Sequence, residues 1–292
     1  MEKSFASWAS QADRAALMTL WRAGFPEDPA LVVERTLDRL LAPETCLVLR
    51  AEEDGREQVV SMAFLLPASL CMDGRELPIQ YLYAVTTLPT WRGRGLGGQL
   101  LREAFRRGQE AGYVGSCLHP GEPSLTAYYR RFGYQEALYM TERQLECGDW
   151  IHWPAAETER LKDIQPSCAE KYRQRRDSFL TGQSGWIRWG SRVVEQEVAS
   201  AQEAGGGVLV GPDGCAVCEP EGECLLLREL LCPPERERTY LRRAIQLWPR
   251  RNIRWRRPVR PAEGGESFGL WRGGSEEFCS LPRGAYLGLA LD

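Results

Sequence analysis

The sequence predicts an α/β (α+β) protein made of two similar units in tandem, each a mixed, mainly antiparallel twisted sheet flanked by helices. Three observations support this class. First, apolar segments with strand periodicity are separated by turn dipeptides. Second, a strand, a glycine-rich turn and an amphipathic helix follow one another in the first half. Third, the order of elements partly repeats in the second half.

The composition is that of an ordinary globular protein and excludes several classes. The chain has 292 residues, of which 43% are hydrophobic and 26% charged, with a net charge of -3. This near-neutral balance gives no reason to expect a nucleic acid or a membrane as partner. No run reaches the roughly 20 apolar residues that a membrane helix needs, and the amino terminus lacks a signal-peptide core, so we expect a cytoplasmic protein. With only two histidines, a three-histidine metal site is excluded.

Periodicity predicts the elements of the first half. Apolar residues at helical spacing indicate two helices between Gln11 and Leu41, separated by Gly24 and two prolines. Strands are expected where apolar runs are bounded by turn dipeptides such as Asp54-Gly55. The remaining expected elements are strands at 46–49, 59–66, 79–87 and 113–118, a surface helix at 96–108, a short helix at 124–132 and a closing strand or hairpin at 134–145.

The second half is expected to begin after a linker at 148–154. This divides the chain into a first domain, 1–148, and a second, degenerate domain, 155–292. At 230–238, the position that corresponds to the first half's glycine-rich turn, the second half has two prolines and no glycine. The expected elements are helices at 157–175, 192–204 and 235–248, and strands at 207–210, 215–219, 224–232, 253–259, 268–271 and 286–291.

The glycine-rich turn within VTTLPTWRGRGLGGQLL, residues 85–101, predicts an anion site. A helix amino terminus carries unpaired N–H groups and partial positive charge, and it binds phosphate where side chains do not obstruct the approach. Gly93, Gly95, Gly97 and Gly98 clear that approach, and two neighbouring arginines add positive charge.

Two other phosphate-binding motifs fit this turn poorly. Gly93, Gly95 and Gly98 satisfy G-x-G-x-x-G, but the acidic residue that a dinucleotide site needs about 20 positions further on is missing. A Walker loop is excluded because no Gly-Lys-Ser/Thr follows.

The pattern Arg92-x-x-Gly95-x-Gly97 after a strand resembles the core motif of the GNAT superfamily of acetyl-CoA-dependent N-acetyltransferases. The resemblance implies that main-chain amides of this turn bind the pyrophosphate of coenzyme A, while Val85 and Thr87 pair with its pantetheine arm. A second signature, YYRRFGY at 128–134, looks like the superfamily's tyrosine element and implies that Tyr129 lies near the thioester sulfur. The implied cofactor-binding residues are Val85, Thr87, Arg92, Gly93, Arg94, Gly95, Leu96, Gly97 and Gly98.

The first half is further similar to the enhanced-intracellular-survival family, in which a tandem pair of GNAT folds precedes a sterol-carrier-like domain. We expect no such third domain here, because no residues remain for it. That family uses its carboxyl-terminal carboxylate in the active site, a role that we do not transfer to Asp292.

The chemistry of acetyl transfer suggests roles for particular residues. Tyr129 is the candidate general acid that protonates the leaving thiolate, with Tyr128 as the alternative. The backbone N–H of Val85 is the candidate oxyanion donor. No carboxylate lies at 77–87, so the base is open: His119 could act through a water or could serve only as a hydrogen-bonding loop residue. Glu122 and Glu44 are weaker candidates.

The resemblance therefore implies an acetyl-CoA-dependent N-acetyltransferase whose acceptor is a primary amine on a small molecule or peptide. The alternatives are a non-catalytic acyl-CoA sensor or partner-binding module, and transfer of a longer acyl or an aminoacyl group. We expect no metal, because Cys215, Cys218, Cys224 and Cys232 follow strand periodicity and are typical of buried thiols. The basic segment 250–260 is explained equally well by a half-buried strand as by a nucleic-acid groove.

Overall fold

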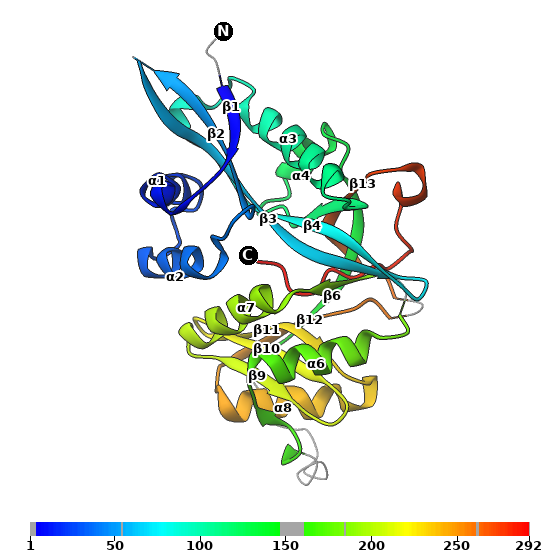
Figure 1. Cartoon of the computed structure of the whole chain (residues 1–292). Coiled ribbons are helices and arrows are strands. Elements are labelled where there is room, and N and C mark those ends of the chain that lie inside the picture. Colours follow the sequence, from blue (N-terminus) through cyan, green and yellow to red (C-terminus); the bar gives the residue numbers. More distant parts are fainter. Residues whose placement is uncertain (1–3, 54, 147–160, 184, 261–262, 292) are drawn as a thin grey trace.

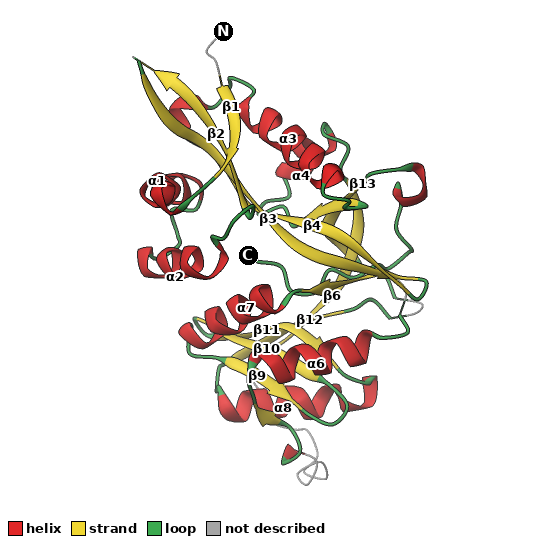
Figure 2. Ribbon diagram, viewed as in Figure 1, coloured by secondary structure: helices red, strands yellow, loops and turns green. Residues whose placement is uncertain are grey.

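We describe the protein from a computed structural model, which describes residues 4–53, 55–146, 161–183, 185–260 and 263–291. Its two halves lie one above the other in Figure 1, joined by long strands that run between them. The expected mixed, mainly antiparallel sheet flanked by helices is confirmed. Figure 2 shows the helices on the outside of these strands in both halves.

The first half contains most of the expected elements. The structure adds a first strand that sequence periodicity did not predict, and its central strands are longer than expected. In chain order, the elements are β1 (Ser4–Trp8), η1 (Gln11–Asp13), α1 (Arg14–Gly24), α2 (Ala30–Leu40), β2 (Cys46–Glu53), β3 (Arg56–Met72), β4 (Arg75–Thr87), η2 (Pro89–Trp91), α3 (Leu96–Glu110), β5 (Gly115–Leu118), α4 (Leu125–Arg130) and β6 (Gln135–Leu145).

The second half follows a similar order of elements. In chain order, they are β7 (Gln165–Pro166), α6 (Ala169–Leu180), β8 (Trp186–Trp189), α7 (Ser191–Glu203), β9 (Gly207–Val210), β10 (Cys215–Glu221), β11 (Cys224–Leu231), η4 (Pro234–Arg236), α8 (Glu237–Leu247), β12 (Asn252–Arg257), β13 (Glu266–Gly273) and η5 (Glu276–Phe278).

Two expectations for the second half were wrong. The helix expected at 157–175 is instead the short strand β7 followed by α6, and the part of that range before residue 161 lies outside the described residues. The strand expected at 286–291 is a buried irregular segment that forms only a bridge between Trp186 and Tyr286. The expected linker at 148–154 also lies outside the described residues, and the division into 1–148 and 155–292 stays a prediction.

Strand pairing links the two halves into one sheet with the order β1-β2-β3-β4-β5-β13-β6-β12-β11-β10-β9-β7. The strand β13 is inserted between β5 and β6, antiparallel to both. A strand from near the carboxyl end of the chain therefore completes the sheet of the first half. In the other direction, β6 of the first half pairs with β12 of the second.

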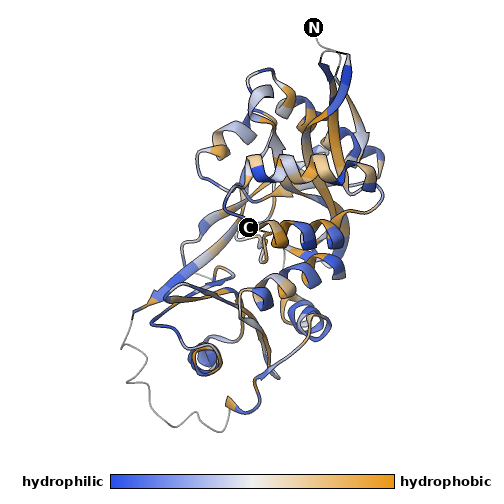
Figure 3. Ribbon diagram, turned by 90° about the vertical axis from the view of Figure 1, so that its left-hand side faces the viewer, coloured by the Kyte–Doolittle hydropathy of each residue, from blue (hydrophilic) through white to orange (hydrophobic). Residues whose placement is uncertain are grey.

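The apolar core has three parts, arranged on the two faces of the sheet. One lies under α3 and α4, and a second lies under α8. The largest includes residues of α1, α2, α6, α7 and the carboxyl-terminal segment, so it is shared by the two halves. Figure 3 shows the helices with hydrophobic residues on one side and hydrophilic residues on the other, as packing on a sheet requires.

Buried arginines hold the carboxyl-terminal segment in this shared core. Arg176 of α6 is fully buried, pairs with Glu229 of β11 at 2.9 Å and donates to the carbonyl of Leu287. Arg228 pairs with Glu197 and donates to the carbonyl of Ala290 at 2.6 Å. Side-chain donors thus satisfy main-chain acceptors that a strand neighbour would otherwise bind.

Candidate active site

The site begins where β4 and β5 separate. Only residues Gln80–Leu82 of β4 pair with β5, in parallel with Ser116–Leu118. Beyond that point β4 continues to Thr87 while β5 ends at Leu118. A bulge opposite β3 interrupts β4 here, and Ala84 within it has a φ of 50°. The bulge bends β4 away from its neighbour, so its last residues, including Val85 and Thr87, are not paired with β5.

The loop between η2 and α3 has the open backbone that the sequence predicted. Gly93 and Gly95 have φ values of 79° and 80°, a region that favours glycine, and a Cβ atom at either position would meet nothing within 4 Å. Gly95 caps α3 without a side-chain hydrogen bond, and the first turn contains no acidic residue. The loop and helix terminus therefore offer an anion accessible main-chain donors.

The two arginines of the loop make local contacts. Arg92 donates from Nε to the carbonyl of Thr87 at 3.1 Å and from its guanidinium to that of Ala23 at 3.2 Å. Arg94 lies over the ring of Trp91, 4.4 Å from the ring centre. Both arginines are exposed, so these contacts place positive charge at the loop without enclosing it.

The glycines at the start of α3 allow close approach by α4. A Cβ atom on Gly97 would lie 2.6 Å from the hydroxyl of Tyr128, and one on Gly98 would lie 2.7 Å from the ring of Phe132. Tyr128 and Phe132 contact each other, with ring centres 5.1 Å apart. We expected these two glycines to clear the approach of an anion. The structure gives them a further role, because the absence of their side chains lets the tyrosine element pack against α3.

Tyr129 lies deeper than Tyr128. It is only 7% exposed and packs in the same apolar cluster as Leu96 of α3 and Val85 of β4. The structure thus brings together the loop, the separated end of β4 and this tyrosine. Burial raises the pKa of Tyr129 above its ordinary value, so the hydroxyl, which would be protonated at neutral pH in any case, stays protonated to a higher pH. Burial also raises the pKa of the half-buried Tyr128.

His119 follows β5 immediately and is held by the inserted strand. Its Nδ1 is hydrogen-bonded to the carbonyl of Phe268 in β13, and the two rings lie 4.3 Å apart. Because a carbonyl only accepts, Nδ1 carries the hydrogen, and Nε2 is the nitrogen that can take up a proton when the ring is neutral. Arg256 of β12 lies over the Phe268 ring at 5.3 Å, so a side chain of the second half borders the partner of His119.

The other candidate bases are less favourably placed. Glu122 and Glu44 are both exposed. Glu76, which precedes the strand segment 77–87, forms an ion pair with Arg188 at 2.7 Å. Asp292 lies outside the described residues.

Two features of the site were missed by sequence reasoning. Buried Ser61 of β3 contacts Thr87 Oγ1 at 2.8 Å and the Thr86 carbonyl at 2.7 Å, which fixes the end of β4. A lone serine in a long apolar strand was a weak signal of this role. The contact from Phe268 to His119 spans 149 residues, and no local pattern announces it.

The structure shows the surroundings of the cysteines and of the basic segment. Among the described residues no cluster of three potential ligands could hold a metal ion, and Cys215, Cys218 and Cys232 are buried in the protein interior. Arg254 and Arg256 of the basic segment pair with Glu221 and Glu142. None of the helices in the described ranges is long and apolar enough to cross a membrane.

Comparison with known families places the first half. Residues 8–137 match the family model of the acetyltransferase (GNAT) domain. The chain is 32% identical over 125 residues to the N-acetyltransferases Eis of Mycobacterium bovis and Mycobacterium tuberculosis. That region is 42% of this chain and 26% of each relative, so the match spans about a quarter of the relatives' length.

Solved structures show a similar fold over most of the chain. A GCN5-related N-acetyltransferase from Kribbella flavida matches 93% of this chain and 72% of its own, with a TM-score of 0.70 and 16% identity. A probable N-acyltransferase from Enterococcus faecalis matches 93% and 73%, with a TM-score of 0.71 and 15% identity. Eis1 from Mycobacterium abscessus matches 92% and 73%, with a TM-score of 0.65 and 16% identity.

Proposed function

Because residues 8–137 of this chain belong to the GNAT acetyltransferase family, we propose that the protein is an N-acetyltransferase that uses acetyl-CoA to acetylate a primary amine. The observation that carries the proposal is the convergence of three parts at one place. These are the open loop before α3, the free end of β4 and the buried Tyr129. The acceptor is proposed by class only.

The residues of the loop fit the pyrophosphate of coenzyme A. The positive φ values and empty surroundings of Gly93 and Gly95 leave room for phosphate oxygens against the backbone. The exposed guanidinium groups of Arg92 and Arg94 add charge-assisted donors at the same loop. The edge of β4 at Val85 and Thr87 would pair with the amides of the pantetheine arm.

Acetyl-CoA supplies a thioester carbonyl that an uncharged amine can attack. In the proposed mechanism the N–H of Val85 donates to the oxygen of that carbonyl as it becomes negative. Tyr129 gives its proton to the sulfur when the carbon–sulfur bond breaks, and the tyrosinate regains a proton from the new amide nitrogen. The raised pKa of Tyr129 keeps the proton available until that step.

His119 is the proposed route for the proton that a protonated amine must lose first. Because Nδ1 donates to the carbonyl of Phe268, Nε2 is the nitrogen that would accept this proton, through a water if the acceptor is not within reach. A second possibility, that His119 only ties β13 to the end of β5, is tested by its substitution: His119→Gln would then lower stability without changing the pH dependence of the rate.

The adjacent tyrosines provide the sharpest test of catalysis. We expect Tyr129→Phe to lower kcat by about 10²- to 10⁴-fold, the usual contribution of a general acid. Tyr128→Phe removes the same atom one residue away and serves as the matched control, with little change in kcat. The measurement is release of coenzyme A thiol from acetyl-CoA with a panel of amines.

Other outcomes point to the alternatives. Calorimetric binding of acetyl-CoA without turnover on any amine would favour a non-catalytic acyl-CoA sensor. Faster turnover with a longer thioester would favour transfer of a longer acyl group. An equal loss in both tyrosine variants would contradict the assignment of the acid to Tyr129.

A further inference from the structure

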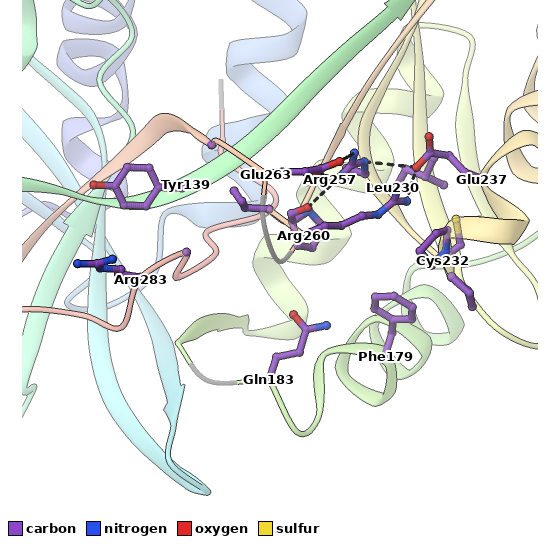
Figure 4. A pocket seen from close by; sticks show the side chains of 16 residues that line it. Tyr139, Phe179, Gln183, Leu230, Cys232, Glu237, Arg257, Arg260, Glu263 and Arg283 are labelled. Atoms are coloured by element: carbon purple, nitrogen blue, oxygen red, sulfur yellow. Dashed lines mark hydrogen bonds and ion pairs between the residues drawn. The ribbon is translucent and has the colours of Figure 1, made fainter.

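The second half contains a cavity of about 940 Å³ at the place that corresponds to the separated strands of the first half (Figure 4). Residues 224–227 of β11 pair in parallel with residues 252–255 of β12, and β11 then continues without this partner to Leu231. The cavity opens beyond this point, between the end of α6, the start of α8 and the segment after β12. Its volume is within the range of small-molecule sites.

One wall of the cavity is apolar. Phe179 of α6 and Val259 after β12 line it and are only partly buried, and the buried residues Leu230 and Cys232 also line it. Figure 4 shows the Phe179 ring and the Cys232 sulfur on the same side of the cavity. Such a wall suits an alkyl chain or a ring.

Among the described residues, one of the arginines that line the cavity has no ion pair. Arg257, only 4% exposed, donates to both oxygens of Glu263 at 2.8 and 3.0 Å. Glu237 contacts Arg257 at 3.3 Å and also pairs with Arg260. Arg283 is exposed at the rim, and no ion pair involves it within the described ranges. Figure 4 shows Arg283 apart from the Arg257–Glu263 pair, near Tyr139.

These features exclude the ligand classes expected in the first half. Pro233 and Pro234 line the cavity where a phosphate loop would offer N–H groups, and proline has none. Glu237 in the first turn of α8 would repel a phosphate. An amine would find both carboxylates already paired with arginine, so the cavity does not suit a cationic acceptor either.

We propose that this cavity binds an amphipathic carboxylate, an alkyl or aromatic acid whose apolar part packs on Phe179, Leu230 and Val259 and whose carboxylate pairs with Arg283. The site is separate from the proposed acetyl-transfer site, and it does not depend on that function.

The proposal is tested by calorimetry with three probes of equal length, octanoate, octylamine and octanol, in the presence and absence of coenzyme A. We expect octanoate to bind once per chain in both conditions, and at least about ten-fold more tightly than the other two, the effect of one charge-assisted hydrogen bond. Arg283→Gln should weaken octanoate binding by a similar factor. Arg192→Gln, an exposed arginine on α7, is the matched control and should leave it unchanged.

A second variant tests the apolar wall. Val259→Trp, which fills the cavity from a partly buried position, should abolish octanoate binding while coenzyme A binding stays unchanged. Three results would overturn the proposal: no octanoate binding, equal binding by Arg283→Gln, or loss of octanoate binding when coenzyme A is added. The last result would place the probe in the first half.

Discussion

Each half contains a strand–turn–helix unit, and the main difference between the two is a loop of four residues that only the first half has between its turn and its helix. In the first half, β4 leads to the 3-10 turn η2, then to the loop 92–95, then to α3. In the second half, β11 leads to the 3-10 turn η4, and α8 starts at the next residue. Both turns begin with proline, and both strands carry a bulge before them. The proposed anion site of the first half therefore depends on the glycine-rich loop 92–95 and not on the shared strand–turn–helix unit.

The bulges of the two strands are also used differently. In β4 the bulge contains small Ala84 and leaves the strand end open beside Tyr129. In β11 the corresponding residues are Arg228 and Glu229, both buried and held in ion pairs. At this position the second half therefore has charged side chains whose ion pairs help to hold the carboxyl-terminal segment.

The largest effect expected from this comparison is on stability. Arg176→Met leaves the carboxylate of Glu229 buried without its partner, which should lower the free energy of unfolding by about 3–5 kcal/mol. Urea denaturation measures this loss. Arg173→Met, on the same helix but paired closely with exposed Glu170 and only at 3.7 Å with Asp177, should cost less than about 1 kcal/mol. Equal losses in the two variants would contradict an anchoring role for the buried pair.

A smaller effect is expected in the loop. The double variant Gly93→Val and Gly95→Val forces two branched residues into the left-handed region, at about 1–2 kcal/mol each, so coenzyme A binding should weaken about 100-fold. Calorimetric titration with coenzyme A measures the change. Gly205→Val, with a φ of 85° and open surroundings, carries the same kind of strain far from the loop and should not alter binding. Undiminished affinity in the double variant would argue against a cradle here.

The smallest effect concerns the contact between α3 and α4. Gly97→Ala places a methyl group 2.6 Å from the Tyr128 hydroxyl and should raise the KM for acetyl-CoA about ten-fold, as modest overpacking does. Adding Tyr128→Phe removes the clashing oxygen and should restore most of the loss. Gly121→Ala, where a Cβ meets nothing, is the control for the assay. A failure of the second substitution to restore KM would show that Gly97 is needed for a reason other than Tyr128.

The sequence was sufficient for features that depend on neighbouring residues. The loop, the amphipathic α3 and the tyrosine element are each local, and the expected positions of Gly93, Gly95 and Tyr129 agree with the structure in conformation or burial. The catalytic and binding roles assigned to them stay predictions until the experiments above are done.

Features that depend on distant pairing could not be predicted. β8 pairs with β3, and β13 lies between β5 and β6. The residue pattern of β8 or β13 does not indicate which strand it pairs with. The segment 286–291 has the apolar character of a strand, and we predicted one. Its carbonyl groups are instead bound by Arg176, Arg228 and Trp189, which hydropathy alone cannot reveal.

The insertion of β13 also has a consequence for how the protein is made. During synthesis, β5 and β6 leave the ribosome long before residue 266 does, so the sheet of the first half keeps a gap until β13 has been made. Contacts over such sequence distances slow folding and leave unpaired strand edges exposed in the meantime. The nascent chain is therefore most vulnerable to aggregation and to chaperone capture in the interval between the synthesis of β6, which ends at residue 145, and that of β13, which begins at residue 266.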